Sequence, residues 1–181
     1  MDDIISENLS GHALWQALRA LPKVDLHRHL EGSLRLETLA EVAHDHGMDL
    51  PSYGMEELRP YVQITDDEPG FHAFLEKFNF LRRFYSGREA IERVAYEAVA
   101  DAAADHVRYL ELRFSPATLA HERGFALDDV ADWVIGAVER AQADFGLMVR
   151  LLVTIKRDAS PDLAGEVART AFSRAGRGVV G

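Results

Sequence analysis

Three short apolar segments along the chain have the length and composition of β-strands. They cover Lys23–Leu30, Val107–Phe114 and Met148–Ile155. The first segment alternates apolar and polar positions, which is typical of a strand with two unlike faces. The third is almost continuously hydrophobic, as are strands that are covered on both faces. We therefore expect three strands, of which the third is the most deeply buried.

Helical patterns fill the intervals between these segments. Apolar residues recur three and four positions apart in Leu36–His46, Phe71–Tyr85, Arg88–Asp105 and Leu127–Phe145. A further helix is expected to begin after Ser160, whose hydroxyl can cap it, with Pro161 at its first position. The stretch Asp49–Gly70 is rich in proline and glycine and is predicted to be the least regular part of the chain.

The order of these elements predicts a parallel α/β sheet with right-handed crossovers. One helix and two extra helices separate the first two strands, and one helix separates the second from the third. The segment Val179-Val180-Gly181 has the composition of the start of a fourth strand. We expect a lead-in helix within residues 1–20 and one domain over residues 21–181.

Composition and charge exclude several classes of function. The 30 acidic and 20 basic residues give a net charge of −10, which disfavours binding to nucleic acid. The chain has no cysteine, so disulfides, thiolate metal sites and the cysteine-ligated zinc of nucleobase deaminases are excluded. The Arg82-Arg83 pair is expected on a solvated helix face. No signal peptide and no apolar run of membrane-spanning length is present, so we expect a cytoplasmic protein that does not bind membranes.

His27 and His29 are the candidate metal ligands. Side chains two residues apart on a strand point the same way, so both imidazoles can reach one ion at about 2.0–2.1 Å. They lie at the carboxyl end of the strand, where chemistry gathers in parallel β/α folds. On spacing alone, the alternative interpretation is that they are two buried histidines whose hydrogen bonds are satisfied by their neighbours.

A second His-x-His pair, His44 and His46, serves as an internal control. It falls at the end of a predicted helix, where residues two apart point about 200° away from each other. We therefore expect both side chains in solvent. The other histidines are not at predicted strand ends: His12, His72, His106 and His121.

The stretch Leu21–Leu39 (LPKVDLHRHLEGSLRLETL) resembles the N-terminal signature of the adenosine deaminase family, within the metal-dependent amidohydrolase superfamily. The resemblance continues through Phe74–Tyr85, Ala90–Ala100 and Val107–Pro116, in the order of that family's helix, helix and second strand. It implies the N-terminal part of a (β/α)8 TIM-type barrel with extra helices after the first strand, truncated at the fourth strand.

The resemblance also implies a function. His27 and His29 would be zinc ligands, and His29 and Glu31 would contact the substrate, a purine nucleoside. Zinc would activate a water that converts adenosine to inosine and ammonia. Many adenosine deaminases carry aspartate at the position of Glu31, and adenine-type relatives carry glutamate. An adenine or modified-adenine-nucleoside deaminase is therefore an alternative.

Other polar and aromatic side chains have structural interpretations. Glu111 and Arg113 share a strand face and are expected to form an ion pair inside the barrel. Asp25 is expected on the same face as the two histidines, in a structural role. Four aromatic residues of the second predicted helix are expected mainly in the core, with lining of the active-site mouth as the alternative: Phe71, Phe74, Phe78 and Phe80.

No catalytic residue is predicted within this chain. By the resemblance, the general acid/base glutamate, two further histidines and a ligating aspartate would lie beyond Gly181. Three β/α units cannot close a barrel, which usually takes about 250 residues. We therefore expect a fragment that neither deaminates adenosine nor holds zinc tightly by itself. The alternative from another class is a non-catalytic half-barrel that needs a partner, such as a complementing C-terminal chain.

Overall fold

A computed structural model describes residues 11–65 and 70–181 of the chain. The helices are α1 (Gly11–Ala20), α2 (Leu36–Asp45), α3 (Met55–Val62), α4 (Phe71–Arg82), α5 (Arg88–Ala104), α6 (Pro116–Ala120), α7 (Leu127–Phe145) and α8 (Pro161–Phe172). The strands are β1 (Lys23–His29), β2 (Val107–Phe114) and β3 (Met148–Val153), and short 3-10 turns cover Leu30–Gly32 and Ala175–Arg177. The predicted alternation of strands and helices is confirmed.

The sheet is parallel, and its strands follow chain order, β1-β2-β3. Residues 178–181 continue it beside β3. Leu151 N donates to Gly178 O at 2.9 Å, and Val153 N donates to Gly181 O at 2.7 Å. Leu151 and Val179 form an isolated parallel bridge, so a fourth strand begins where the apolar pattern predicted it.

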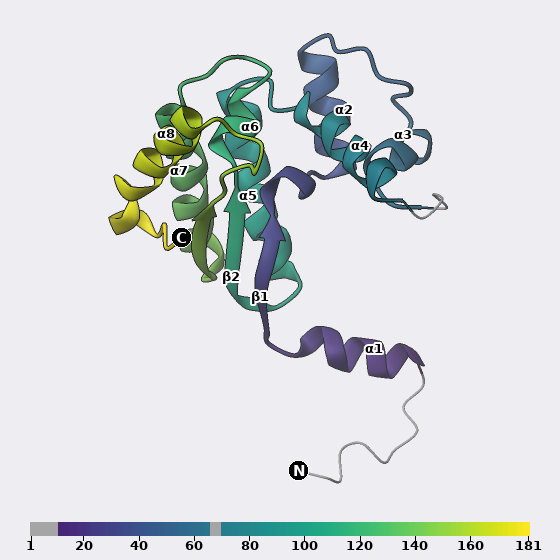
Figure 1. The fold of residues 1–181 in the computed structure, drawn as a ribbon. Helices are drawn as coiled ribbons and strands as arrows, with labels where there is room; N and C mark the ends of the chain where they lie inside the picture. Colours follow the sequence, from purple (N-terminus) through teal and green to yellow (C-terminus); the bar gives the residue numbers. More distant parts are fainter. Residues whose placement is uncertain (1–10, 66–69) are drawn as a thin grey trace.

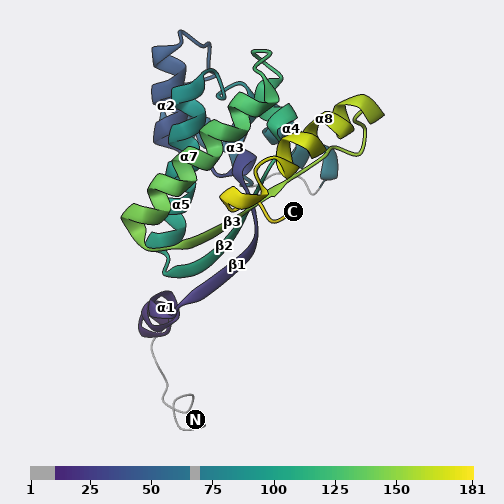
Figure 2. The same ribbon diagram turned by 90° about the vertical axis from the view of Figure 1, so that its left-hand side faces the viewer.

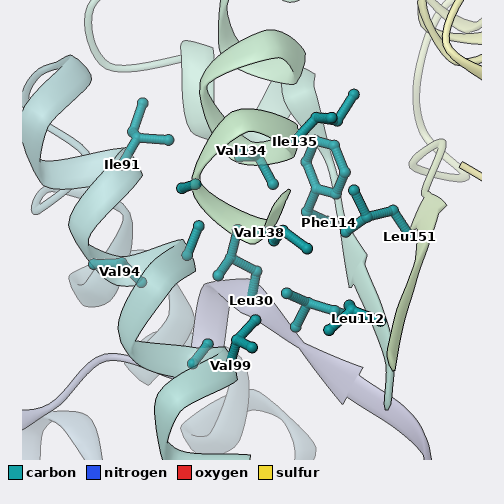
Figure 3. Close-up of a cluster of buried hydrophobic side chains, with 14 of the residues drawn as sticks. Leu30, Ile91, Val94, Val99, Leu112, Phe114, Val134, Ile135, Val138 and Leu151 are labelled. Carbon is teal, nitrogen blue, oxygen red and sulfur yellow. The ribbon is translucent and has the colours of Figure 1, made fainter. Parts of the chain in front are cut away.

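Helices α5 and α7 cover one face of this sheet (Figures 1 and 2). The face of β2 that carries Leu110, Leu112 and Phe114 packs against them in one core cluster, part of which Figure 3 shows. Full burial of such side chains stabilises a fold by roughly 1.5–3 kcal/mol each. No described helix lies against the opposite face of β1 and β2 (Figure 2). Tyr109, Glu111 and Arg113 of β2 alternate with the buried Leu110, Leu112 and Phe114 and therefore point to this opposite face.

Helices α2, α3 and α4 form a smaller layer beyond the carboxyl end of β1 (Figure 1). They enclose a second hydrophobic cluster that includes Leu39, Leu58 and Phe84. Helix α3 lies within the stretch predicted to be the least regular, so a helix forms where none was predicted. Pro60 removes one hydrogen bond within the helix, and the fully buried Leu58 packs the helix into the second cluster.

Two further expectations are corrected at the other strands. Helix α6 was not predicted: Ser115 follows β2 and caps this helix by accepting from Thr118 N, with Pro116 in its first turn. Strand β3 is shorter and less buried than expected, since it ends at Val153 and Met148 is 50% exposed. Only residues 178–181 lie beyond it, which leaves this edge partly open.

Helix α1 lies within the predicted lead-in segment, and residues 1–10 fall outside the described residues. It is set apart from the sheet (Figure 1), and none of its residues is buried. No helix in the described ranges is long and apolar enough to span a membrane. The division into residues 1–20 and 21–181 stays a prediction.

Candidate metal and substrate site

A cavity of about 300 Å³ opens at the carboxyl ends of the strands. Its walls come from the end of β1, from α4, from the β2–α6 junction and from the segment after β3. The lining residues are His29, Glu31, Phe74, Leu75, Phe78, Arg82, Ser115, Thr118, Thr154 and Lys156. Parallel strands all end at one edge of a sheet, so residues distant in sequence converge there.

His29 lines this cavity, and His27 lies beside it. Their Nε2 atoms are 3.3 Å apart, and their ring centroids are 5.2 Å apart. Two nitrogens bound at about 2.0–2.1 Å to one tetrahedral ion lie about 3.3–3.4 Å apart. The two imidazoles therefore fit adjacent positions on one zinc ion. Within the described residues, no group of three or more His, Cys, Asp or Glu side chains could hold a metal.

The electrostatic surroundings of His29 favour the neutral ring. Partial burial lowers its pKa first, and the positive charges of Arg113 and His27 lower it further. Arg113 is the partner of His29 in the sheet register, so the guanidinium lies on the same face. A neutral imidazole is the form that binds metal ions, because a protonated ring has no free lone pair.

A bulge in β1 places these histidines. Asp25 pairs with Leu110, whereas Arg28 pairs with Leu112, so three steps along β1 oppose two along β2. Asp25 and Arg28 therefore point to the helix-covered face, where Arg28 Nε donates to Asp25 Oδ2 at 2.8 Å. The expectation that Asp25 shares the face of His29 is wrong, because simple alternation fails at a bulge.

Asp25 also supports the bulge directly. Its Oδ1 accepts a hydrogen bond from His27 N at 3.1 Å. Arg28 Nη1 in turn donates to Ala98 O on α5 at 3.4 Å. The backbone beneath the histidine pair is thus connected to the main core.

Glu31 is the buried carboxylate of the cavity, with 8% of its surface exposed. Its Oε1 accepts from Ser115 N at 2.7 Å, and its Oε2 is buried without a partner in the described part of the chain. Burial raises the pKa of this carboxyl, opposed by backbone hydrogen bonds and the charge of Arg82. Tyr85 holds the same turn, because its hydroxyl donates to Leu30 O at 3.0 Å.

The aromatic residues of α4 divide between two roles. Phe74 and Phe78 line the cavity, with ring centroids 5.0 Å apart in an edge contact. Phe80 packs instead in the second cluster, near Phe84. The side chain of Phe71 lies outside the described residues. Core packing, the main expectation, holds for Phe80, and the alternative holds for Phe74 and Phe78.

The predicted Glu111–Arg113 ion pair is absent from the described residues. Glu111 Oε1 accepts from Tyr109 OH at 3.1 Å, and Arg113 Nε is buried without a hydrogen-bond partner among them. Residues two apart on a strand are separated by about 6.6–6.8 Å. Tyr109 shares the face and reaches the carboxylate, whereas Arg113 lies beside His29.

Arg82 is the cavity residue that sequence reasoning misplaced. The Arg82-Arg83 pair was expected in solvent, but Arg82 lines the cavity and its Nε is buried. Arg83 is exposed as predicted and donates to Asp49 O. A signal was present, since Arg82 follows Phe74 and Phe78 at helical spacings of eight and four and so shares their face. Lys156, which follows β3, was also missed.

The second His-x-His pair behaves as predicted. Both side chains are exposed at the end of α2, and that of His44 is 84% exposed beside Asp45. The same spacing therefore gives convergent nitrogens on β1 and separate solvent-exposed rings on α2.

Known proteins are similar to this chain in both sequence and fold. A family model for adenosine deaminase matches residues 22–181, which include the histidine pair and every cavity residue. The chain belongs to the adenosine deaminase family. The resemblance found in the sequence is thereby confirmed.

Curated relatives include the adenosine deaminases of Aliivibrio fischeri strain MJ11 and Shewanella denitrificans. The first is 39% identical over 145 residues, which is 80% of this chain and 44% of the relative. The second is 39% identical over 139 residues, with 77% and 42% covered. This chain therefore spans less than half the length of these relatives.

Solved structures of TIM-barrel deaminases have the same fold. An adenine deaminase from Arthrobacter aurescens superimposes with a TM-score of 0.75 at 28% identity, over 90% of this chain and 48% of that one. An amidohydrolase from Burkholderia ambifaria with bound Zn gives 0.78 at 25% identity, with 98% and 47% covered. Arabidopsis ADAL complexed with GMP gives 0.74 at 27%, with 92% and 50% covered. The predicted barrel-type fold is confirmed.

Proposed function

We propose that this chain supplies part of the active site of a zinc-dependent hydrolase that deaminates adenosine to inosine and ammonia. The observation that carries the proposal is the 3.3 Å separation of His27 Nε2 and His29 Nε2 at the end of β1. This separation suits two ligands on a tetrahedral ion. The family and the zinc-bound Burkholderia ambifaria neighbour support the same choice of metal.

Bound zinc would supply an activated water near neutral pH. The residues of this chain would bind the ion and bind and orient the substrate. His27 and His29 would hold the ion, and His29 would also face the substrate. Glu31 would accept a hydrogen bond from a substrate hydroxyl, while Phe74 and Phe78 would cover the purine and exclude water.

We infer that catalysis needs residues from outside this chain. The histidine pair supplies two ligands, whereas a catalytic zinc site usually takes three from the protein. The chain spans 44% of the length of its Aliivibrio fischeri relative. The general acid/base glutamate and the other ligands would come from the remaining half of the barrel, so the chain alone would be inactive.

A chain that completes the barrel would be the natural partner. An apolar cavity of about 270 Å³ lies between α8 and residues 178–181, and Phe172 at its rim is 82% exposed. Such a surface beside a strand edge suits the next β/α unit. Under the half-barrel interpretation, docking would be the function and the histidines would have no catalytic role. Co-purification with the C-terminal half of a relative tests this directly.

Glu31 favours a second candidate reaction, the deamination of adenine or of a modified adenine nucleoside. Adenine-type members of the family resemble this chain in carrying glutamate at this position. The likeness to the Arthrobacter aurescens adenine deaminase also favours this second candidate reaction. Comparing adenosine and adenine as substrates of the completed barrel separates the two candidates.

The test of the zinc site uses the two His-x-His pairs. We expect the purified chain to bind zinc weakly, and His27→Ala or His29→Ala to reduce its affinity at least about tenfold. His44→Ala and His46→Ala are matched controls and should leave the affinity unchanged. Calorimetric titration measures it. Equal losses from both pairs would contradict the assignment.

Activity is tested separately. We expect no ammonia release from adenosine by the chain alone. Co-expression with the C-terminal half of the Aliivibrio fischeri enzyme should restore deamination, and His27→Ala should abolish it. Deamination by the isolated chain would show that the proposed division of the site is wrong.

A further inference from the structure

We propose that Arg82 and Lys156 form an anion-binding subsite in the cavity, which accepts the phosphate of a purine nucleotide. The inference rests on the proposed function for the purine and adds the phosphate. Both residues line the cavity, Arg82 from α4 and Lys156 from the segment after β3. Both lie far beyond His29 and Glu31 in the sequence, yet the fold brings all four residues to one cavity.

Arg82 and Arg113 are the two arginines in the described ranges whose Nε is buried without a hydrogen-bond partner, and of these two Arg82 lines the cavity. Its Nε is buried without a hydrogen bond, and none of its atoms makes a hydrogen bond or ion pair with a described residue. A buried donor without an acceptor is unfavourable, and a charged acceptor relieves this more than a neutral one. Eight other arginines in the described ranges form ion pairs: Arg28, Arg35, Arg59, Arg88, Arg93, Arg140, Arg174 and Arg177.

Lys156, on the segment after β3, also lines the cavity without a side-chain partner among the described residues. Its ammonium makes no hydrogen bond or ion pair with the described part of the chain, although the protein carries a net charge of −10. Glu31 is the one carboxylate among the residues that line the cavity. Its Oε1 accepts from Ser115 N, and the charge of Arg82 lowers the pKa of this carboxyl, so Glu31 offsets part of the guanidinium charge. Lys156 has no second carboxylate among the lining residues to offset its own charge.

Phosphate fits this arrangement better than a smaller or singly charged anion. A planar guanidinium binds two oxygens of one phosphate, and an ammonium can bind a third as a point charge. The hydroxyls of Thr118 and Thr154 also line the cavity and can donate to phosphate oxygens. A volume of about 300 Å³ lies at the lower end of the range for small-molecule sites. With Glu31 near a sugar hydroxyl, the cavity suits a nucleoside monophosphate.

The experiment measures binding of AMP, adenosine and inorganic phosphate to the full 181-residue chain without zinc, by calorimetric titration. We expect AMP to bind at least about tenfold more tightly than adenosine or inorganic phosphate, with stronger binding at low salt. Arg82→Gln and Lys156→Gln should each reduce AMP affinity about tenfold and leave adenosine affinity unchanged. Arg83→Gln and Arg157→Gln are the adjacent controls and should change neither.

Several outcomes would overturn the subsite. These are equal affinities for AMP and adenosine, no AMP binding by wild-type chain whose circular dichroism shows it folded, or equal effects of Arg82→Gln and Arg83→Gln. Inorganic phosphate binding as tightly as AMP would exclude the nucleotide. The proposed function fails differently, through absent zinc binding or absent deamination in the completed barrel, while the AMP preference persists.

Discussion

The two His-x-His pairs of this chain have the same spacing and opposite surroundings. On β1, the Nε2 atoms of His27 and His29 are 3.3 Å apart, at a strand bulge that is followed by the buried Leu30. On α2, His44 and His46 lie in solvent at a helix end. The difference shows that spacing becomes a metal site only when secondary structure aims the rings together and the core holds the backbone beneath them.

The largest expected effect comes from removing that support. Leu30 follows the first pair and is fully buried, so Leu30→Ala should lower the free energy of unfolding by about 2–5 kcal/mol. Met48 follows the second pair and is only half-buried, so Met48→Ala should lower the free energy of unfolding by clearly less. Urea unfolding followed by circular dichroism measures both. Equal losses would mean that the two pairs are anchored alike.

Asp25 tests the bulge. Asp25→Ala would leave Arg28 without its ion pair and His27 N without its acceptor. The expected cost is about 1–3 kcal/mol of stability, accompanied by weaker zinc binding because the rings would no longer converge. Asp45→Ala removes an exposed carboxylate beside the second pair and is the control. If Asp25→Ala left the zinc affinity unchanged, the bulge would not be what positions the two histidine ligands.

Gly47 tests how the second pair is positioned. Its φ of +58° lies in the left-handed region, where the chain leaves α2. Gly47→Ala should therefore lower stability by about 1 kcal/mol and leave zinc affinity unaltered. Thermal unfolding and zinc titration of the same sample check both parts. A loss of zinc binding would place the second pair in the metal site after all.

His44→Ala should have the smallest effect. The ring is 84% exposed, and its contact with Asp45 is a surface ion pair only when the histidine is protonated. Such pairs contribute roughly 0–1 kcal/mol, so we expect a change in stability below about 0.5 kcal/mol at neutral pH. A larger loss in urea unfolding would reveal a structural role that exposure does not suggest.

Local patterns were sufficient where local preference and tertiary packing agree. The three strands, α5 and α7 were all predicted from their apolar patterns. The apolar faces of β2, β3, α5 and α7 form the core cluster, whereas Val24 and Leu26 of β1 are exposed. Helix α3 was missed, since proline and glycine signals describe the local chain and not the burial of Leu58. The bulge was missed for a similar reason: the alternation of β1 gives no sign that three of its residues oppose two of β2.

The sequence by itself determined the family, the order of strands and helices, and the identity of the two histidines, because these depend on residue type and spacing. Only the tertiary structure decided which groups share the site. It turned Asp25 away from the histidines, separated Glu111 from Arg113, and brought Arg82 and Lys156 into one cavity with Glu31. Contacts between residues far apart in the chain depend on where strands end and how helices pack, and no local pattern encodes that geometry.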